Sequence, residues 1–339
     1  MRAIVATRAL PSSNPLAFER RELPDPTPGD QDLLIRVEAV AVNPVDTKVR
    51  ASLPQDPGPG RILGWDGAGV VEAAGGAVRG FCPGDAVFFA GDITRPGCYA
   101  EKVLVDGRVC GPKPASLSFG EAAALPLTSL TAWEALFERI GLDSEGADAG
   151  RRLLILGGAG GVGSIAIQLA RRAGLEVIAT ASRPESRAWC LDLGANHVVD
   201  HHQPLAPQLA ALGYSDVDAI ANFSDTDAYW QVMAELIKPQ GAIVCIVGNR
   251  NPLDLNVLKG KSVKFAWEFM FTRPQYRTAD MAQQGVILGR ISQLVDSGIL
   301  RSTCHNRLSP INADTLRQAH GQLESGQTIG KLVIEGWGE

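Results

Sequence analysis

The clearest pattern of apolar and polar positions lies in the middle of the chain, between residues 151 and 173. Residues 153–156 form a short, uninterrupted apolar run, which predicts an inner strand of a parallel sheet covered on both faces. From Val162 to Ala173, apolar residues return at steps of three and four, which predicts a helix with one stripe against that sheet. Glycines crowd residues 157–163 between the two. The pattern therefore predicts a strand, a tight turn and a helix in direct succession.

The alternation of strand and helix patterns continues to about residue 266. Five further strands are expected, at 176–181, 197–199, 217–222, 242–247 and 262–266. Helices are expected between them at 184–193, closed by Gly194, and at 227–237. Six strands separated by helices are the number that a doubly wound dinucleotide-binding fold requires.

The first 120 residues instead show the two-residue period of half-buried strands. Apolar and charged positions alternate in residues 34–42, and 67–73 and 86–90 are further strand candidates, which together predict an irregular barrel. A capping box at Ser118 and Glu121 then begins a mainly helical stretch that runs to residue 140, with a kink expected at Pro126.

The C-terminal part breaks the alternation and completes the expected domain organisation. Helices are expected at 289–297 and 314–323, and a closing strand at 331–335 is expected to return to the first domain. The prediction is an α/β protein of two domains. Its β-barrel catalytic domain comprises residues 1–125 and 267–339, and its doubly wound dinucleotide-binding domain comprises residues 126–266.

The composition of the chain limits the classes of partner and the cellular location that are expected. The 339 residues carry a formal net charge of −5 with acidic and basic residues interspersed, which offers no footprint for nucleic acid or an anionic membrane. A small-molecule partner is the better expectation. The early apolar run spans only residues 3–6, far short of a signal-peptide core or a spanning helix, so a cytoplasmic location is expected. The six cysteines are scattered, as expected of buried free thiols.

The glycine-rich turn carries the spacing of a dinucleotide-binding loop. Gly158, Gly160 and Gly163 follow the pattern G-x-G-x-x-G, in which the glycines allow a tight turn, close approach of a pyrophosphate and helix packing. Because a strand precedes the turn and a helix follows it, the context supports nucleotide binding over a structural turn. Gly161 and Val162, in the same turn, complete the predicted phosphate contacts.

Longer motifs give the chain a specific family resemblance that covers essentially its whole length. These motifs are residues 43–46 (Asn-Pro-Val-Asp), 64–70 (Gly-Trp-Asp-Gly-Ala-Gly-Val), 83–85 (Pro-Gly-Asp), 124–132 and 159–163. With the barrel, the capped helix and the nucleotide fold in this order, the sequence resembles the medium-chain dehydrogenase/reductase superfamily. Within it, the sequence is most similar to the quinone oxidoreductase-like branch, which implies a GroES-like barrel beside a Rossmann domain.

The same superfamily contains zinc alcohol dehydrogenases, so metal binding must be judged from this sequence. The zinc branch has Gly-His-Glu where this chain has residues 64–66, and an indole such as that of Trp65 cannot ligate zinc. All five histidines lie at residue 197 or later, and the closely spaced cysteines of a structural zinc lobe are absent from the sequence. The prediction is therefore no metal site. Cys304 and His305 are a leftover pair, interpreted as structural.

Cofactor choice depends on the end of the second strand of the nucleotide domain. An NAD-selective fold carries an acidic residue there, whereas this chain has Ser182 and Arg183. Pro184 suits the first position of a helix, so both residues flank a helix N-terminus, which favours the 2′-phosphate of NADPH. The alternative is that Ser182 caps the helix and the arginines are solvated. Arg187 lies one turn further along the helix, and for it phosphate binding and a solvated surface charge both remain open. The resemblance adds His201 as a candidate contact near the same phosphate.

Further cofactor contacts are expected where strands end, because such folds bind ligands at the carboxyl ends of their strands. The residues in question are Asn222, Phe223 and Ser224 after the fourth strand, and Val247, Gly248 and Asn249 after the fifth. The resemblance adds Asn43, Thr128 and Lys331. For Thr128, the alternative is a hydroxyl that is bonded to the backbone of its own helix.

Hydride transfer to an alkene conjugated to a carbonyl needs a well-placed nicotinamide and donors for the oxygen that becomes an enolate. The resemblance puts Asn43, Asp46, Lys48 and Trp65 at the catalytic cleft, with Asp66 nearby. Lys48 is the candidate donor to the substrate carbonyl, and the alternatives for it are a surface lysine or a contact to the cofactor ribose. Trp65 is interpreted either as a wall over the nicotinamide or as filling of the barrel core.

The resulting hypothesis is a zinc-independent, NADPH-dependent reductase of quinones or α,β-unsaturated carbonyls. The rival hypothesis is an NADPH-binding structural or regulatory protein whose reductase activity is incidental, because fold does not fix function. The expected substrate is an apolar carbonyl compound or quinone. Residues 267–271 are rich in aromatic side chains that suit a substrate pocket, core packing or a dimer contact, and a homodimer or higher homo-oligomer is expected from the resemblance.

Overall fold

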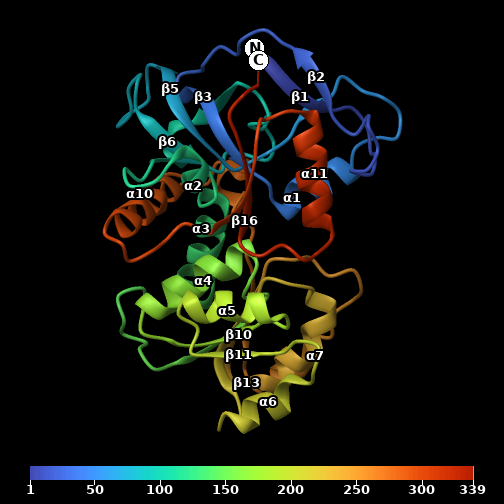
Figure 1. Cartoon of the computed structure of the whole chain (residues 1–339). Helices are drawn as coiled ribbons and strands as arrows, with labels where there is room; N and C mark the ends of the chain where they lie inside the picture. Colours follow the sequence, from blue (N-terminus) through green and yellow to red (C-terminus); the bar gives the residue numbers. More distant parts are fainter. Residues whose placement is uncertain (339) are drawn as a thin grey trace. The chain divides into compact units, whose positions relative to one another are not determined.

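The structure is a computed structural model and is described for residues 1–338. The chain divides into two compact units. Thr131–Met270 forms what we call the central unit, and Met1–Leu130 together with the segment from Phe271 onward forms the terminal unit. Both chain ends lie in the terminal unit (Figure 1).

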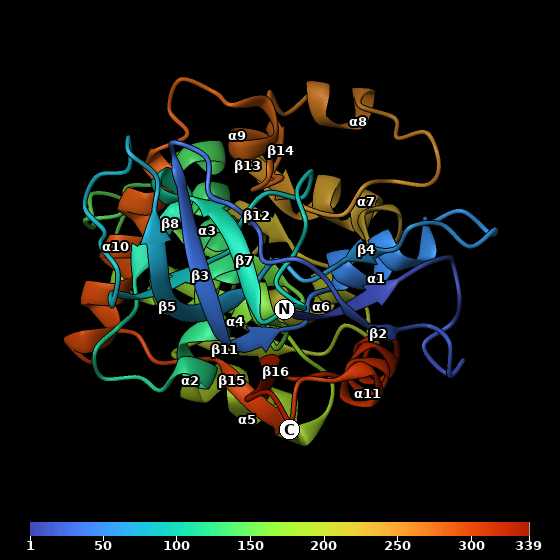
Figure 2. The same ribbon diagram turned by 90° about the horizontal axis from the view of Figure 1, so that it is seen from above.

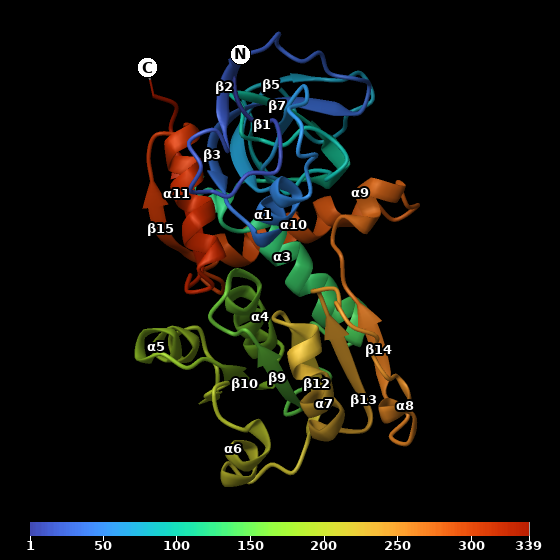
Figure 3. The same ribbon diagram turned by 90° about the vertical axis from the view of Figure 1, so that its right-hand side faces the viewer.

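The central unit is built on a six-stranded, entirely parallel sheet whose strands lie side by side in Figure 3. In spatial order its strands are β11 (His197–Val199), β10 (Glu176–Thr180), β9 (Arg152–Leu156), β12 (Val217–Asn222), β13 (Ile237–Cys245) and β14 (Lys264–Trp267). The strand of this sheet that comes first in the chain, β9, lies in the middle. The strand order reverses between β9 and β12, which is the doubly wound arrangement. The six predicted strands are therefore confirmed.

Helices connect these strands. They are α4 (Gly161–Arg172), α5 (Pro184–Asp192), α6 (Leu205–Ala211), α7 (Thr226–Leu236) and α8 (Asn256–Lys259). Leu153–Leu156 of β9 are all at most 1% exposed, as expected of a strand covered on both faces. The strand β13 begins five residues before the predicted start at 242, because Ile237 pairs with Val217 ahead of an irregularity in the ladder. The polar residues after Ile237 conceal this start in the sequence.

The antiparallel strand pairs of the described chain all lie in the terminal unit. One sheet has the order β15 (Cys304–Leu308), β16 (Lys331–Glu335), β3 (Asp32–Ala41), β5 (Gly67–Ala74), β6 (Ala86–Phe89) and β8 (Cys110–Pro112), with β7 (Lys102–Asp106) also paired to β3. A smaller sheet has the order β2 (Glu19–Glu22), β1 (Arg2–Ala6) and β4 (Arg61–Ile62). In the view from above, β3, β5 and β7 lie close together (Figure 2). The predicted return of the last strand is confirmed, since β16 pairs with β3.

The helices of the terminal unit depart from the predictions in several places. They are α1 (Pro44–Ala51), η1 (Gly107–Val109), α2 (Phe119–Ala123), α9 (Thr272–Tyr276), α10 (Gln283–Asp296) and α11 (Ala313–Glu324). The helices α1 and α9 and the short 3₁₀ helix η1 were not predicted. The helix α10 begins six residues before the predicted start, because Gly285 is not a helix breaker here: a Cβ at this position would lie 2.6 Å from the carbonyl oxygen of Arg108. The glycine permits close packing of the helix.

The predicted helical stretch from 121 to 140 consists of three pieces. After α2, the helix α3 (Pro126–Trp133) starts at the proline, and a π-helical segment, η2 (Glu134–Ile140), follows it. The predicted kink is confirmed, since the helix is interrupted between Ala123 and Pro126. Within residues 1–338, no helix combines the length and the apolar character needed to span a membrane.

Candidate functional site

The glycine turn of the central unit joins the carboxyl end of β9 to the N-terminus of α4 (Figure 3). The amide of Gly157 donates to Thr180 Oγ1 at 3.0 Å and that of Gly158 to the Thr180 carbonyl at 3.2 Å, which ties the turn to the end of β10. A Cβ at Gly163 would lie 2.3 Å from the Gly157 carbonyl oxygen, whereas one at Gly160 would meet nothing closer than 3.5 Å. The turn is thus tightly closed at Gly163 and open at Gly160, beside helical amides that suit a phosphate.

The end of β10 places the candidate 2′-phosphate residues. The N-cap of α5 is Arg183, so Ser182 stands one residue before the cap and the alternative in which Ser182 caps the helix is wrong. Arg183 is exposed and Ser182 is half-buried. The guanidinium of Arg187 donates to the carbonyls of Ala181 at 3.3 Å and Val198 at 2.8 Å, which links β10 to β11. These bonds favour a structural role for Arg187.

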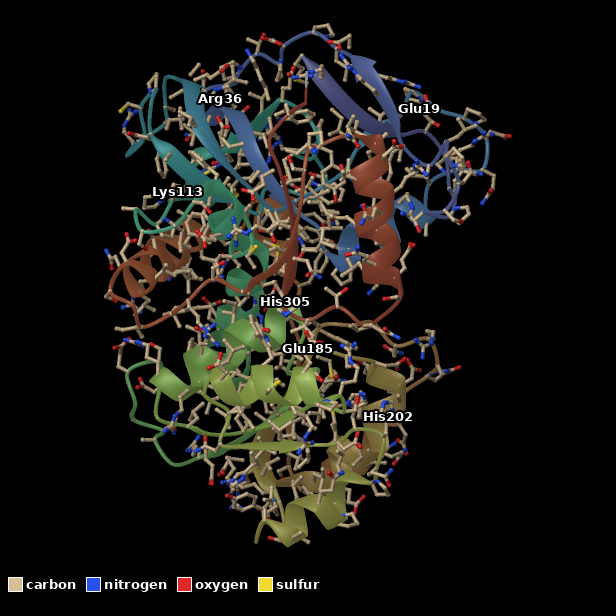
Figure 4. The ribbon with its side chains drawn as sticks, in the orientation of Figure 1. Glu19, Arg36, Lys113, Glu185, His202 and His305 are labelled. Atoms are coloured by element: carbon tan, nitrogen blue, oxygen red, sulfur yellow. The ribbon has the colours of Figure 1, made fainter. Side chains whose placement is uncertain are left out.

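Two neighbours of this region are exposed. Glu185 lies in the first turn of α5, and His202 lies on the loop between β11 and α6 (Figure 4). His201 is exposed, and its ring centroid lies 4.4 Å from that of His202. Partial burial, together with the neighbouring His202, lowers the pKa of His201, so its ring is uncharged near neutral pH. A neutral ring would offer a phosphate one hydrogen bond at most.

The other predicted contacts gather at the same edge of the sheet, because β9, β12 and β13 are parallel and in register. The buried Asn222 accepts from the amide of Ser224 at 2.9 Å and thereby shapes the turn through Phe223. The hydroxyl of Thr226 donates to the Val247 carbonyl at 2.5 Å. Beyond it, Gly248 and Asn249 are exposed. These loops and the glycine turn therefore form one continuous edge that suits a dinucleotide.

The terminal unit contains a buried ion pair. Lys331 Nζ lies 3.0 Å from Asp66 Oδ2, and it also donates to Asn43 Oδ1 at 2.6 Å and to the Val42 carbonyl at 2.9 Å. The side-chain amide of Asn43 donates to Asp66 Oδ2 at 3.1 Å, and the backbone amide of Leu127 donates to Asp66 Oδ1 at 3.1 Å. Burial raises the pKa of Asp66, while the adjacent ammonium opposes that shift. Since all three donors of Lys331 have acceptors, the structure favours a role within this cluster over cofactor contact.

Asp46 lies beside this ion pair and is fully buried. Its Oδ2 accepts from the backbone amide of Asn43 at 2.8 Å and from the Tyr99 hydroxyl at 3.1 Å, while Oδ1 has no hydrogen-bond partner within residues 1–338. Burial raises the pKa of Asp46 to about 7. Neither Asp46 nor Asn43, which is 2% exposed, presents a free side chain to a substrate. Both are therefore better placed to organise the site than to react.

The remaining catalytic candidates differ in access. Trp65 is 1% exposed, its ring packs edge-on against Phe271, and its Nε1–H donates to the Arg95 carbonyl at 3.4 Å, which favours the core-filling interpretation. Thr128 donates to the carbonyl of Leu125 at 3.1 Å, which is the local alternative. Lys48, by contrast, is exposed on α1. Of the four catalytic candidates, Lys48 alone reaches solvent in the described chain.

Sequence reasoning missed several members of these clusters. They are Thr180, Arg50, Tyr99, His320 and Glu324. His320 could have been noticed, because it extends the apolar stripe of Leu316 and Ala319 on its helix, where a histidine is unusual. The others carry no local signal, since each partner comes from a distant part of the chain.

Comparisons with known proteins agree with this architecture. Residues 29–115 match the alcohol dehydrogenase GroES-like domain, and residues 161–283 match the zinc-binding dehydrogenase family. A zinc-type alcohol dehydrogenase-like protein of Staphylococcus aureus strain MSSA476 is 43% identical over 94% of this chain and 93% of its own length. The chain belongs to the medium-chain dehydrogenase/reductase superfamily.

Other members of the superfamily extend the comparison. The 2-methylene-furan-3-one reductase of Solanum lycopersicum is 30% identical over 90% of this chain and 72% of its own length. The solved structure of a candidate zinc-dependent alcohol dehydrogenase from Rhizobium etli CFN 42 is 49% identical, with a TM-score of 0.95 over 100% of this chain and 99% of that one. The predicted α/β fold of a GroES-like domain with a Rossmann-like sheet is thereby confirmed, and the protein is an oxidoreductase of this superfamily.

Two more distant structures carry ligand or substrate information in their descriptions. The quinone oxidoreductase from Coxiella burnetii is 28% identical, with a TM-score of 0.80 over 99% of each chain. The mycobacterial protein Rv1454c, solved in complex with NADPH, is 26% identical, with a TM-score of 0.83 over 99% of this chain and 100% of that one.

Because zinc enzymes occur in the superfamily, we asked which side chains of this chain could bind a metal ion. Residues 1–338 contain no cluster of three or more His, Cys, Asp or Glu side chains that is suited to a metal ion. Asp66 is already paired with Lys331, and His305 lies on β15 with an exposed side chain (Figure 4). Cys304 is half-buried beside it in sequence.

The central unit of this superfamily member also holds a buried pair of carboxyl groups, Glu134 on η2 and Glu268 directly after β14. Arg139 Nε lies 2.8 Å from Glu268 Oε2, and Arg139 NH2 lies 3.7 Å from Glu134 Oε2. Burial, reinforced by the charge of Glu134, raises the pKa of Glu268 to about 9. The Glu268 carboxyl is therefore protonated at neutral pH, and the Arg139 guanidinium supplies a positive charge beside the pair.

Glu268→Gln is expected to make the folded state more stable at high pH. The folded pKa lies above the unfolded value of 4.5, so the stabilisation by this proton is full below about pH 4.5 and is lost as the pH rises towards 9. The unaltered protein should lose about 1.4 kcal/mol of unfolding free energy per pH unit between pH 6 and 8 from this group. Urea unfolding at both pH values measures the slope, which should flatten in Glu268→Gln and persist in the half-buried control Glu138→Gln. An equal slope in all three proteins would contradict the raised pKa of Glu268.

Proposed function

We propose that the protein is a zinc-independent reductase that uses NADPH to transfer a hydride to a quinone or an α,β-unsaturated carbonyl compound. The observation that carries the proposal is the glycine turn, closed at Gly163 and open at Gly160, at the edge where four parallel strands end. A phosphate fits this edge, since a side chain at Gly160 would fill the space that the turn leaves. NADPH, when bound, supplies the hydride.

The choice of NADPH is supported by the residues after β10. Ser182 and Arg183 stand where an NAD-selective fold has a carboxylate, and both flank the start of α5. The NADPH complex of the mycobacterial relative and the names of the quinone and furanone reductases support the same reading of cofactor and substrate.

Within the proposed reaction, the protein's own groups have two tasks. Lys48 donates a hydrogen bond to the substrate carbonyl, where negative charge grows as the hydride arrives. The buried cluster of Asn43, Asp66 and Lys331 fixes the start of α1, because Asn43 is its N-cap. Neither task requires a metal.

Steady-state assays test the proposal directly. Turnover of a panel of enones and quinones should be seen with NADPH and should be unchanged by EDTA, with no zinc in elemental analysis of the purified protein. NADPH binding without turnover on any panel member would favour the rival structural or regulatory role. Activity lost on removal of about one zinc per chain would overturn the zinc-independent mechanism.

Arg183→Glu is expected to abolish the preference for NADPH. In the unaltered protein NADPH should bind at least tenfold more tightly than NADH, a difference of about 1.4 kcal/mol. A carboxylate at this position would repel the 2′-phosphate and accept from the ribose hydroxyl of NADH instead. Titration by nicotinamide fluorescence measures both affinities, with Arg290→Glu, an exposed arginine on α10, as the charge control. An unchanged preference in Arg183→Glu would remove the phosphate assignment.

We also propose a homodimer or higher homo-oligomer in the cytoplasm, with a small-molecule partner and neither nucleic acid nor membrane. The strand β14 is at the edge of its sheet, and Trp267 and Phe269 nearby are 43% and 44% exposed, which suits a contact with a second copy. Cys98, Cys110, Cys190 and Cys245 are buried free thiols, as expected in a reducing compartment. Light scattering on the eluting protein gives its mass, and a monomer would exclude the oligomer.

A further inference from the structure

No apolar side chain of the helix α1, which carries Lys48, is fully buried, since Val45 and Val49 are half-buried. The buried residues of the helix are Asp46 and Arg50, both charged. The two are four residues apart and therefore lie on the same face of the helix. Helices of this length ordinarily keep their place by burying apolar side chains. Apart from the contacts of its N-cap Asn43, the position of α1 therefore depends largely on the polar partners of Asp46 and Arg50.

One side chain joins the partners of both anchors. His320 Nδ1 lies 2.9 Å from Arg50 NH1, and its Nε2 lies 3.2 Å from the Tyr99 hydroxyl, which in turn donates to Asp46 Oδ2 at 3.1 Å. Arg50 also forms an ion pair with Glu324, one turn after His320 on α11. His320 thus connects α11 to both buried residues of α1.

The donors and acceptors of this network have a single consistent assignment. A guanidinium only donates, so Nδ1 of His320 must accept from Arg50 and the ring proton must lie on Nε2. The Nε2–H then donates to Tyr99, whose own hydrogen is directed to Asp46. Burial, with a smaller contribution from Arg50, lowers the pKa of His320 to about 3, so the ring stays neutral and this pattern persists across the physiological range.

The part of the network around the His320 ring is also closed to water. His320 and Tyr99 are both 0% exposed, and the Phe18 ring packs edge-on against His320 at 4.9 Å between centroids. The Arg50 guanidinium lies 5.9 Å from the centroid of the same ring. Because water cannot replace a lost partner here, removal of the imidazole leaves buried polar groups unpaired and lets α1 shift.

We propose that His320 is a positioning residue for Lys48. The inference rests on the proposed function, and in particular on the bond from Lys48 to the substrate carbonyl. Lys48 lies two residues from each anchor and is exposed, so it is on the opposite side of a short helix whose buried face His320 fixes. A shift of that face moves the ammonium with it. Misplacement of a catalytic group by about 1 Å can cost on the order of 10²-fold in rate.

The test is a double-mutant cycle with His320→Leu and Lys48→Met. His320→Leu keeps much of the volume and deletes both nitrogens, so kcat for an enone with saturating NADPH should fall about 10- to 100-fold. His320→Gln, which keeps a donor and an acceptor, should recover part of the loss. Gln318→Leu, an exposed position on the same helix, is the control and should match the unaltered protein. In a Lys48→Met background, His320→Leu should cause no further fall in kcat.

An equal fall in kcat in both backgrounds, or none in either, would overturn the inference while leaving the reductase function in place. Full activity of Lys48→Met would do the same. If His320→Leu does not fold, Tyr99→Phe gives the same comparison, because it removes one hydroxyl between His320 and Asp46 and keeps the ring. Absence of turnover by the unaltered protein on every enone and quinone would overturn the proposed function, and this inference with it.

Discussion

Gly163→Ala is expected to abolish cofactor binding, with the Kd for NADPH raised by at least about 100-fold, or 2.7 kcal/mol. A Cβ at this position would lie 2.3 Å from the Gly157 carbonyl oxygen and 2.7 Å from that of Gly158. Both contacts are with backbone, so no side-chain rotation can relieve them. The turn would have to open, and the helical amides of α4 would move from the positions that suit a phosphate. Nicotinamide fluorescence measures the loss.

Gly160→Ala is the matched control for the stability of the turn without cofactor. The added methyl group would meet nothing closer than 3.5 Å, and the backbone of Gly160 has an ordinary negative φ. Its Tm without cofactor should equal that of the unaltered protein, whereas that of Gly163→Ala should fall. NADPH affinity should fall in both, since the methyl group at 160 occupies the space proposed for the pyrophosphate. If Gly163→Ala bound NADPH normally, the turn would not be the phosphate site.

Lys48→Met is expected to lower kcat by about 100-fold, with a smaller effect on KM. The ammonium is exposed on α1, and its bond to the substrate oxygen should strengthen as that oxygen becomes an enolate. Methionine keeps most of the apolar stem and removes the charge. Single-turnover hydride transfer at saturating NADPH and enone isolates the chemical step from binding and product release.

Lys48→Arg keeps the positive charge in a different geometry and should recover part of the rate. Unchanged single-turnover transfer in Lys48→Met would exclude the catalytic role. A raised Kd for NADPH as the sole change would instead make Lys48 a cofactor contact, which is the ribose alternative.

Much of the central unit could be predicted from the sequence, since its strands are continuous apolar runs between turn residues. The bounds of β11 and β12, and those of β16 in the terminal unit, agree with the predictions, whereas β13 starts early in a polar stretch that carries no strand pattern. The helix α1 escaped prediction for a physical reason: its two fully buried residues are charged, and the half-buried pair Val45 and Val49 is too short an apolar pattern to indicate a helix.

The residues of the candidate site likewise fall into those that the sequence could predict and those that it could not. The glycine turn and the residues after β10 are local in sequence, and motif spacing found them. The network around His320 joins residues 221 and 270 positions apart, and no spacing rule relates such partners. Burial was equally hidden: Asn43 and Asp46 look like accessible polar residues in the sequence, and only their packing shows that neither meets solvent.

The ion pair between Lys331 and Asp66 gives the protein an internal counter-ion. A carboxylate in this position needs a positive charge, and here that charge is covalently part of the chain. It cannot dissociate, be removed by a chelator or be exchanged for another ion, so the charge balance at Asp66 is independent of metal supply. An attempt to build a metal centre around Asp66 would have to remove the lysine as well as introduce ligands, because an ammonium group already occupies the coordinating oxygen.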